Sequence, residues 1–308
     1  MKRIVSVSLG SPKGDKTVRT TLLGEEFEIA RIGTNGDFKR FAELMRELDG
    51  KVDAIGLGGI DRYLYAGKRR YTIRDADKLA RLAIKTPVVD GSGIKNTLER
   101  ETIEWLQREG IVDFQTKKVL LVCGVDRFGM AESLWRLTRP KGQVIYGDLL
   151  FNVGVPIPIT SWGMLKILGL IFLPLICRLP FKWLYPIGEQ QEKNTPRHEK
   201  YFRWADVVAG DFKIIKRFMP TPESGAMTGK VVITNTLTQS DIDNMKACKV
   251  KMLVTSTREF DGRTFATNVV EGILVALSGK RPEEMTEQDY IELLRKLDWQ
   301  PTVRILND

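Results

Sequence analysis

The pattern with the most chemical meaning in this chain is a 34-residue stretch in its middle. Lys118–Phe151 predicts a buried strand, a tight turn, a helix and a second strand that leads into an acid. In a parallel α/β sheet, such a helix start directs unpaired N–H groups and a partial positive charge at phosphate. Asp148 lies 24 residues beyond Gly124, near the expected place of a ribose-binding carboxylate. The stretch therefore predicts a nucleotide cleft.

The turn in this stretch departs from the usual dinucleotide fingerprint. Where G-x-G-x-x-G has three glycines, this chain has Gly124 and Gly129, with Asp126 and Arg127 between them. These side chains partly obstruct close backbone approach to a pyrophosphate. Two interpretations stay open: a cofactor turn made by these four residues, or an ordinary strand-to-helix connection. Side chains of Asp126 or Arg127 that fill the crevice would exclude two linked phosphates.

Length and composition indicate a globular protein of two domains. The chain has 308 residues, of which 43% are hydrophobic and 28% are charged. The apolar part of the N-terminus is too short for a signal-peptide core, so a cytoplasmic location is expected. Three scattered cysteines without a C-x-x-C pair predict neither a disulfide framework nor a zinc site. His198 is the only histidine, which argues against a Ser-His-Asp mechanism.

The net charge of +9 is concentrated in one segment. Between Ser161 and Arg217 there are ten Lys or Arg against five Asp or Glu. The chain shows no helix-turn-helix, zinc or RNP-type pattern, so nucleic acid is not an expected partner. An anionic membrane surface or a phosphorylated ligand suits this location better.

Alternating strand and helix patterns predict an α/β protein with two domains. Residues 1–115 form an N-terminal α/β substrate domain in this interpretation, and residues 116–280 form a Rossmann-like domain with a parallel sheet. Residues 281–308 are a C-terminal helical segment, which we expect to pack back over the first domain. A possible homodimer is left open.

An apolar insertion at residues 155–189 interrupts the second domain. Its longest uncharged run has 11 residues, which is too short to cross a bilayer, and Pro174 and Pro180 are predicted to break a continuous helix. Trp162, Trp183 and Tyr185 bracket the apolar residues, as in segments that lie in a membrane interface or line a hydrophobic pocket. A buried helical hairpin or a dimer contact is the alternative interpretation.

A second motif, Val88-Val89-Asp90-Gly91-Ser92-Gly93, precedes the nucleotide-like unit and opens a helix. From Pro87 to Asp148 the order and spacing resemble the shikimate and quinate dehydrogenase family, whose T-D-G-x-G segment leads into the cofactor strand. The resemblance implies that Asp90 helps to bind and ionise a substrate hydroxyl. The domain order is also similar to acyl-carrier-protein reductases. The whole chain looks like bacterial proteins labelled quinate 5-dehydrogenase by similarity.

The chain departs from that family at two functional positions. The N-x-T-x-P-x-K segment, which supplies a catalytic lysine, is absent, so Lys68 and Lys95 are only positional candidates for this role. The basic motif that reads a 2′-phosphate is replaced by Gly147-Asp148. A carboxylate there would repel the extra phosphate, so NAD is favoured over NADP if either binds.

Candidate substrate residues lie on three loops or helix starts. A strand-ending glycine run leads into a charged pair, as a substrate loop would, and the helix after Asp90 begins with polar residues. A later helix start carries an arginine that could hold a carboxylate or phosphate. Helix capping and tight packing are the structural alternatives for these positions. The candidates are Gly59, Asp61, Arg62, Ser92, Asn96, Arg263 and Asn268.

Together these features favour an NAD(P)-dependent oxidoreductase that transfers a hydride between nicotinamide and an alcohol or carbonyl substrate. Asp90 would hold the reacting group and a lysine would relay the proton. The rival hypothesis is a non-catalytic Rossmann-like protein that binds a lipid or a membrane surface through residues 161–189.

Overall fold

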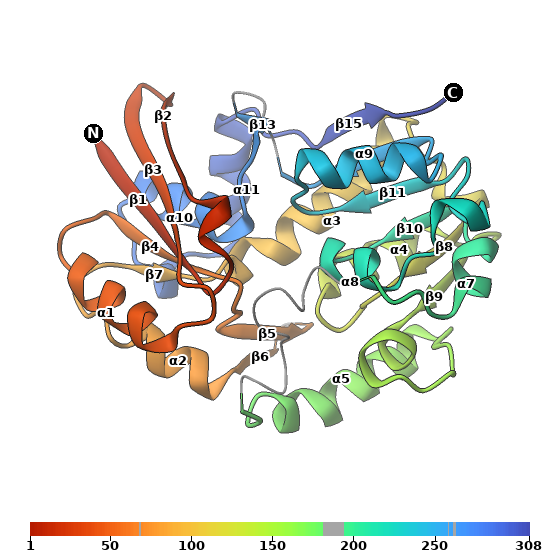
Figure 1. The fold of residues 1–308 in the computed structure, drawn as a ribbon, viewed down its shortest axis with the longest axis horizontal. Helices are drawn as coiled ribbons and strands as arrows, with labels where there is room; N and C mark the ends of the chain where they lie inside the picture. The colour runs from red at the N-terminus through yellow and green to blue at the C-terminus, as the bar shows by residue number, and fades with distance from the viewer. Residues whose placement is uncertain (68, 181–193, 258, 261–262) are drawn as a thin grey trace.

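The computed structural model describes residues 1–67, 69–180, 194–257, 259–260 and 263–308. Two sheets lie side by side, each with its own helices, so the predicted two-domain α/β class is confirmed (Figure 1). The first sheet has the order β2-β3-β1-β4-β7, in which only β2 and β3 pair antiparallel. Its strands are β1 (Lys2–Ser8), β2 (Lys16–Leu22), β3 (Glu25–Gly33), β4 (Ala54–Gly58) and β7 (Val88–Val89).

The second sheet has the order β15-β12-β11-β10-β8-β9. All its pairs are parallel except that of β12 with β15. Its central strands are short apolar runs buried on both faces, as is usual where helices cover a parallel sheet. The strands are β8 (Lys118–Leu121), β9 (Gln143–Tyr146), β10 (Val207–Ala209), β11 (Val231–Thr234), β12 (Met252–Thr255) and β15 (Thr302–Ile305).

The helices follow the predicted alternation closely. Those of the first half are α1 (Phe38–Leu48), α2 (Arg74–Ala80) and α3 (Ser92–Arg108). Those of the second half are α4 (Phe128–Leu137), α5 (Trp162–Ile176), α7 (Glu199–Trp204), α8 (Phe212–Phe218), α9 (Gln239–Ala247), α10 (Thr267–Ser278) and α11 (Glu287–Lys296). Two hairpins, β5–β6 (Tyr63–Ala66 and Arg69–Thr72) and β13–β14 (Glu259–Phe260 and Arg263–Thr264), and a π-helix at Asp148–Val153 complete the fold with short 3-10 turns.

The C-terminal part of the chain returns to the first domain before it ends in the second. Val270 and Ile273 of α10 pack with Ile4 and Phe27 of the first sheet, and Tyr290 of α11 joins the same cluster. Helix α10 belongs by sequence to the predicted second domain, residues 116–280, but it packs on the sheet of the first domain. The reason is that its buried apolar side chains contact that sheet. Strand β15 then closes the edge of the second sheet.

Helix α5 lies at the lower edge of the molecule (Figure 1), and Trp162 in its first turn packs on Phe128 and Trp135 of α4. It runs through Pro174, so the prediction that this proline breaks the helix is wrong. Pro174 stands in the last turn, and the hydrogen bond that it removes is the one from its own nitrogen to the carbonyl four residues earlier. In the described ranges, no helix has the length and apolar character needed to span a bilayer.

Candidate functional site

The strand order defines where a ligand of this fold should lie. The chain leaves β8 for β9 on one side and returns to β10 on the other side of β8. In open α/β sheets, ligands bind outside the carboxyl ends of the two strands at such a switch point. Two loops meet there, the turn Cys123–Arg127 after β8 and Gly210–Asp211 after β10. Helix α3 supplies side chains to the same place.

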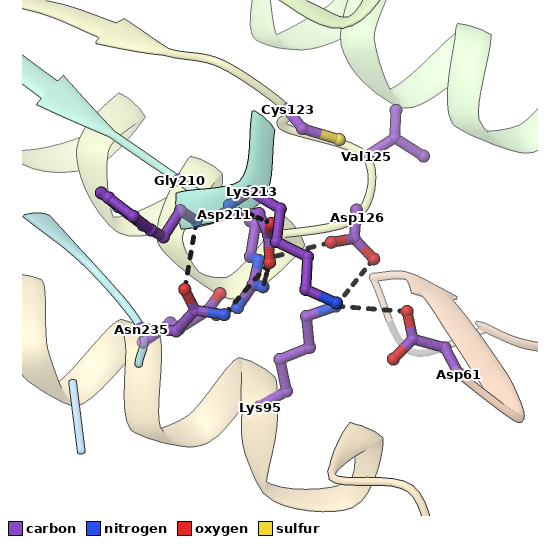
Figure 2. A network of polar contacts seen from close by, with 12 residues as sticks. Asp61, Lys95, Cys123, Val125, Asp126, Gly210, Asp211, Lys213 and Asn235 are labelled. Carbon is purple, nitrogen blue, oxygen red and sulfur yellow. Dashed lines mark hydrogen bonds and ion pairs between the residues drawn. The ribbon is translucent and has the colours of Figure 1, made fainter. Parts of the chain in front are cut away.

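A network of buried and half-buried charges occupies this switch point (Figure 2). The Nζ atom of Lys95, on α3, lies 2.7 Å from Oδ1 of Asp126 and 3.9 Å from Oδ2 of Asp61. Asp61 follows β4 of the first sheet, whereas Asp126 follows β8 of the second. Lys95 therefore links the carboxyl ends of the two sheets.

Arg127 forms the second half of the network. Its side chain is buried, with 4% of the residue exposed, and pairs with Glu99 and with Asp211. Its Nε atom also lies 3.3 Å from Oδ2 of Asp126. The amide of Asn235, at the end of β11, donates a hydrogen bond of 3.1 Å to Asp211. The guanidinium thus fills the space between the ends of β8 and β10.

The network keeps its two cations charged and leaves one acid near its titration point. Burial raises the pKa of Asp61 to about 6, against the attraction of Lys95. Burial opposes the charged form of Lys95, but Asp126 and Asp61 outweigh it and raise the pKa of this lysine. Asp61 can therefore exchange a proton in mildly acidic solution.

Asp90 is held by donors from its own surroundings. Its Oδ2 accepts hydrogen bonds from the backbone N–H groups of Arg62, at 2.5 Å, and Tyr63, at 3.0 Å. Its Oδ1 accepts from the backbone N–H of Ser92, at 3.2 Å, and from its hydroxyl, at 2.6 Å. This geometry supports a role in joining the loop after β4 to the start of α3. The catalytic role of Asp90 stays a prediction that these contacts do not favour.

The turn after β8 does not fit a dinucleotide. The backbone N–H groups of Gly124 and Val125 each donate to the buried carboxylate of Asp148 at 2.9 Å. Asp148 is thus turned into the loop instead of toward a ribose. A Cβ on Gly124 would lie 2.9 Å from Leu165 of α5, so this helix covers the turn. With Arg127 beside it, the space for two linked phosphates is taken.

Gly129 also serves packing in this structure. A Cβ at this position would lie 2.2 Å from the carbonyl oxygen of Asn96, because α3 and α4 cross closely here. The side chain of Asn96 accepts a hydrogen bond of 3.0 Å from the N–H of Gly129. The candidate substrate residue Asn96 therefore caps α4, which lacks a side-chain cap from its own N-cap residue.

The remaining candidates lie apart from the network. The side chain of Arg62 turns to Asp77, at 2.8 Å, and Asn268 donates to Ser6 under the first sheet at 2.8 Å. Gly59 has a φ of 73° and forms the turn that leads to Asp61. The side chain of Arg263 and the whole of Lys68 lie outside the described residues.

Three acids near the site were not among the sequence candidates: Glu99 and Glu271, which are buried, and Asp211, which is half-buried. Glu99 stands four residues after Lys95, a spacing that places both on one face of α3 and could have been noticed. Asp211 lies two residues after the apolar strand β10, much as Asp90 follows β7. Nothing local marks Glu271, which lies inside α10. Within the part of the chain that the structure describes, no group of three or more His, Cys, Asp or Glu could hold a metal ion.

Glu271 gives a prediction on pH dependence. Its carboxylate accepts from the N–H of Gly91 at 2.6 Å and from the hydroxyl of Tyr290 at 3.0 Å. Burial, with Asp90 nearby, raises its pKa from 4.5 to about 8. The folded state therefore binds this proton more tightly than the unfolded state, so the contribution of Glu271 to stability is full below pH 4.5 and is lost as pH rises through 8.

We expect the wild-type protein to lose stability relative to Glu271→Gln as pH rises from 4.5 to 8. Glutamine cannot ionise, so the difference between the two proteins isolates the titration of this one group. Urea unfolding at a series of pH values measures it. A difference in the free energy of unfolding that stays constant over this range would contradict the assignment.

Comparison with solved structures finds distant likeness to several proteins. Heterohexameric glutamate dehydrogenase from Thermus thermophilus is 12% identical, with 96% of this chain and 74% of that chain covered and a TM-score of 0.43. A solute-binding protein of an ABC transporter from Burkholderia multivorans is 12% identical, with 92% and 96% covered and a TM-score of 0.40. NAD-dependent malic enzyme from Thermotoga maritima is 11% identical, with 97% and 84% covered and a TM-score of 0.35. These scores are too low to carry a functional inference.

Family comparison covers nearly the whole chain. No curated protein matches it. Residues 3–90 match the family described as Domain of unknown function (DUF8753), and residues 93–306 match Domain of unknown function (DUF8754). The division between the two falls at the start of α3, directly after the first sheet's last strand. Because the second match spans more than half of the sequence, the chain belongs to the DUF8754 family.

Proposed function

We propose that this protein binds anionic membrane surfaces through helix α5. One observation carries the proposal: a row of large apolar side chains on α5 faces solvent, each with 42–58% of its surface exposed. A buried stripe, which includes Leu165, Gly169 and Leu173, fixes the opposite face of the helix to the protein. The exposed residues are Met164, Ile167, Leu170, Ile171, Phe172 and Leu175.

The size of this face fits shallow insertion. A helix of 15 residues is about 22 Å long, which is too short to span a hydrocarbon core but enough to lie in the interface. Full burial of one such side chain contributes about 1.5–3 kcal/mol. Since about half of each is available, the row supplies on the order of 5 kcal/mol, comparable to a single acyl anchor. Stable binding therefore needs a second, electrostatic contribution.

The charges around α5 supply that contribution. Residues 149–188 contain no acid, whereas Lys166 lies on the helix and Arg178 follows its end. Arg74 lies beside that end, since its N–H donates to the carbonyl of Cys177 at 3.0 Å. A basic residue near an anionic bilayer contributes about 1 kcal/mol. A symmetric dimer through the same face would bring like charges together, so the charges favour lipid over a second copy.

Flotation with lipid vesicles tests the proposal. The protein should float with phosphatidylcholine vesicles that contain phosphatidylglycerol and much less with phosphatidylcholine alone. Added salt should weaken binding only in part, because screening removes the electrostatic contribution and leaves apolar insertion. Protein that remains in the bottom fraction, apart from the vesicles, in every lipid mixture would overturn the proposal.

The predicted dehydrogenase is the rival of this proposal. The Rossmann-like strand order and its switch point support it. The amides taken by Asp148 and the space taken by Arg127 weigh against it. We therefore expect no saturable binding of NADH or NADPH at millimolar concentrations, as measured by cofactor fluorescence. Saturable binding of either would favour the dehydrogenase.

A further inference from the structure

A cavity of about 650 Å³ opens along β9, the edge strand of the second sheet, beside the first turn of α5. We infer that this cavity binds the phosphorylated headgroup of an anionic lipid, an inference that rests on the proposed membrane contact of α5. The volume lies within the range of small-molecule sites. Its walls come from α4, the loop after it, β9, the start of α5 and Trp204 of α7.

The lining has the charge of an anion site. Arg139 is the only charged residue among the lining residues, and no acid stands with it. Across the described residues, no carboxylate forms an ion pair with Arg139 at 4.0 Å or less. The hydroxyls of Thr160 and Ser161 and the amide of Gln143 add neutral hydrogen-bonding groups. An unpaired guanidinium with such neighbours suits a phosphate oxygen better than a cation or an apolar group.

An aromatic stack holds Arg139 in place. Its guanidinium lies over the ring of Trp135, with Cζ 4.4 Å from the ring centroid. Trp135 stacks in turn on Trp162 of α5, with centroids 5.6 Å apart and planes at 20°. The ring centroids of Trp162 and Phe128 lie 4.8 Å apart. A guanidinium held flat on an indole keeps its N–H groups at the edge, free to donate to a ligand.

The edge of β9 offers a further donor. The N–H of Gln143 donates to the carbonyl of Lys117, just before the neighbouring strand β8, at 3.1 Å. The N–H of Tyr146 points the other way, out of the sheet's edge, and donates to the carbonyl of Ile159 at 2.8 Å. Since the N–H groups of a strand alternate in direction, the N–H of Val144 points outward along the cavity. Backbone N–H groups are common donors to phosphate.

The position of the cavity explains why the ligand should be a lipid. Ser161, Trp162 and Gly163, at the start of α5, form part of its wall. The exposed apolar row begins at Met164 on the same helix. A headgroup bound at Arg139 can therefore leave its acyl chains beside that row. A free phosphate ester would use the same donors, so the experiment must separate the two sources.

The first arm uses a soluble probe. We expect glycerol 3-phosphate to change the tryptophan fluorescence of the protein, because three tryptophans line the cavity. Arg139→Gln should weaken this binding by about tenfold or more, the effect of one lost charge-assisted hydrogen bond. Lys141→Gln is the matched control. It removes the same charge only two residues away, but the side chain of Lys141 does not line the cavity.

The second arm uses vesicles of phosphatidylcholine with and without phosphatidic acid. Arg139→Gln should reduce the preference for phosphatidic acid more than Lys141→Gln does. Ile167→Glu should reduce flotation with both lipid mixtures while it leaves the binding of glycerol 3-phosphate intact, which separates this site from the proposed membrane contact. If Arg139→Gln weakens only the binding of the soluble probe, the ligand is a free phosphate ester and the lipid assignment is overturned. Failure of wild-type protein to bind the probe, or equal behaviour of the two charge variants, would overturn the site itself.

Discussion

Arg127→Met is expected to lower the free energy of unfolding by about 3–5 kcal/mol, the usual effect of removing one partner from a buried ion pair. The substitution leaves the carboxylates of Glu99 and Asp211 without their cation in a buried site. Methionine fills similar space, so the loss would report uncompensated charge and not a cavity. Urea unfolding followed by circular dichroism measures the change.

Two further variants make this prediction specific. Arg108→Met removes an exposed arginine near the end of the neighbouring helix and should change stability by less than about 0.5 kcal/mol. The double variant Arg127→Met with Glu99→Gln removes the buried cation together with one of its acids, so it should recover part of the lost stability. A single variant as stable as wild type would contradict the claim that the buried ion pairs of Arg127 stabilise the fold.

The double variant Ile167→Glu, Ile171→Glu is expected to lower the affinity for phosphatidylglycerol vesicles by about a hundredfold or more. Both side chains are more than half exposed, at 58% and 55%, so the protein should fold normally. Each substitution removes apolar surface that would enter the bilayer and adds a charge that anionic lipid repels. A total of about 2.7 kcal/mol is enough for a hundredfold effect.

The chain offers a closely matched control for this experiment. Ile305, on β15, has the same 58% exposure as Ile167. Strand β15 lies on the opposite side of the molecule from α5 (Figure 1). Ile305→Glu should therefore float as wild type does. A loss from Ile305→Glu as large as that from the single variant Ile167→Glu would show that binding follows net charge and not the α5 face, and the proposal would fail.

Much of the fold was predictable because its signals are local. The strand-turn-helix-strand order of 118–151 appears as β8, α4 and β9, and the helix predicted to open at the Asp90 motif appears as α3. The placement of α10 was not predictable in the same way. Its periodicity marks a buried helix, but which sheet it covers depends on contacts with residues more than 200 positions earlier, such as Ile4.

The candidate site shows the same division. Asp61, Lys95, Asp126 and Arg127 were all candidates, and the structure brings them together at the switch point. The sequence could not reveal that Arg127 would be held by acids from α3 and from the loop after β10, because ion-pair partners so far apart leave no local pattern. The position of Asp148 allowed two interpretations. The spacing that suits a ribose-binding carboxylate also suits a carboxylate that accepts hydrogen bonds from the turn after β8, and the structure shows the second arrangement.

The most direct measurement on the membrane contact is the environment of residue 172 on α5. The solvent-exposed residue Phe172 can be replaced by cysteine and labelled with the polarity-sensitive dye NBD, since the native cysteines are buried. Addition of phosphatidylglycerol vesicles should brighten the emission and shift it to the blue, whereas a label at residue 305 should not respond. An unchanged spectrum at residue 172 in protein that remains folded and monomeric would contradict the account.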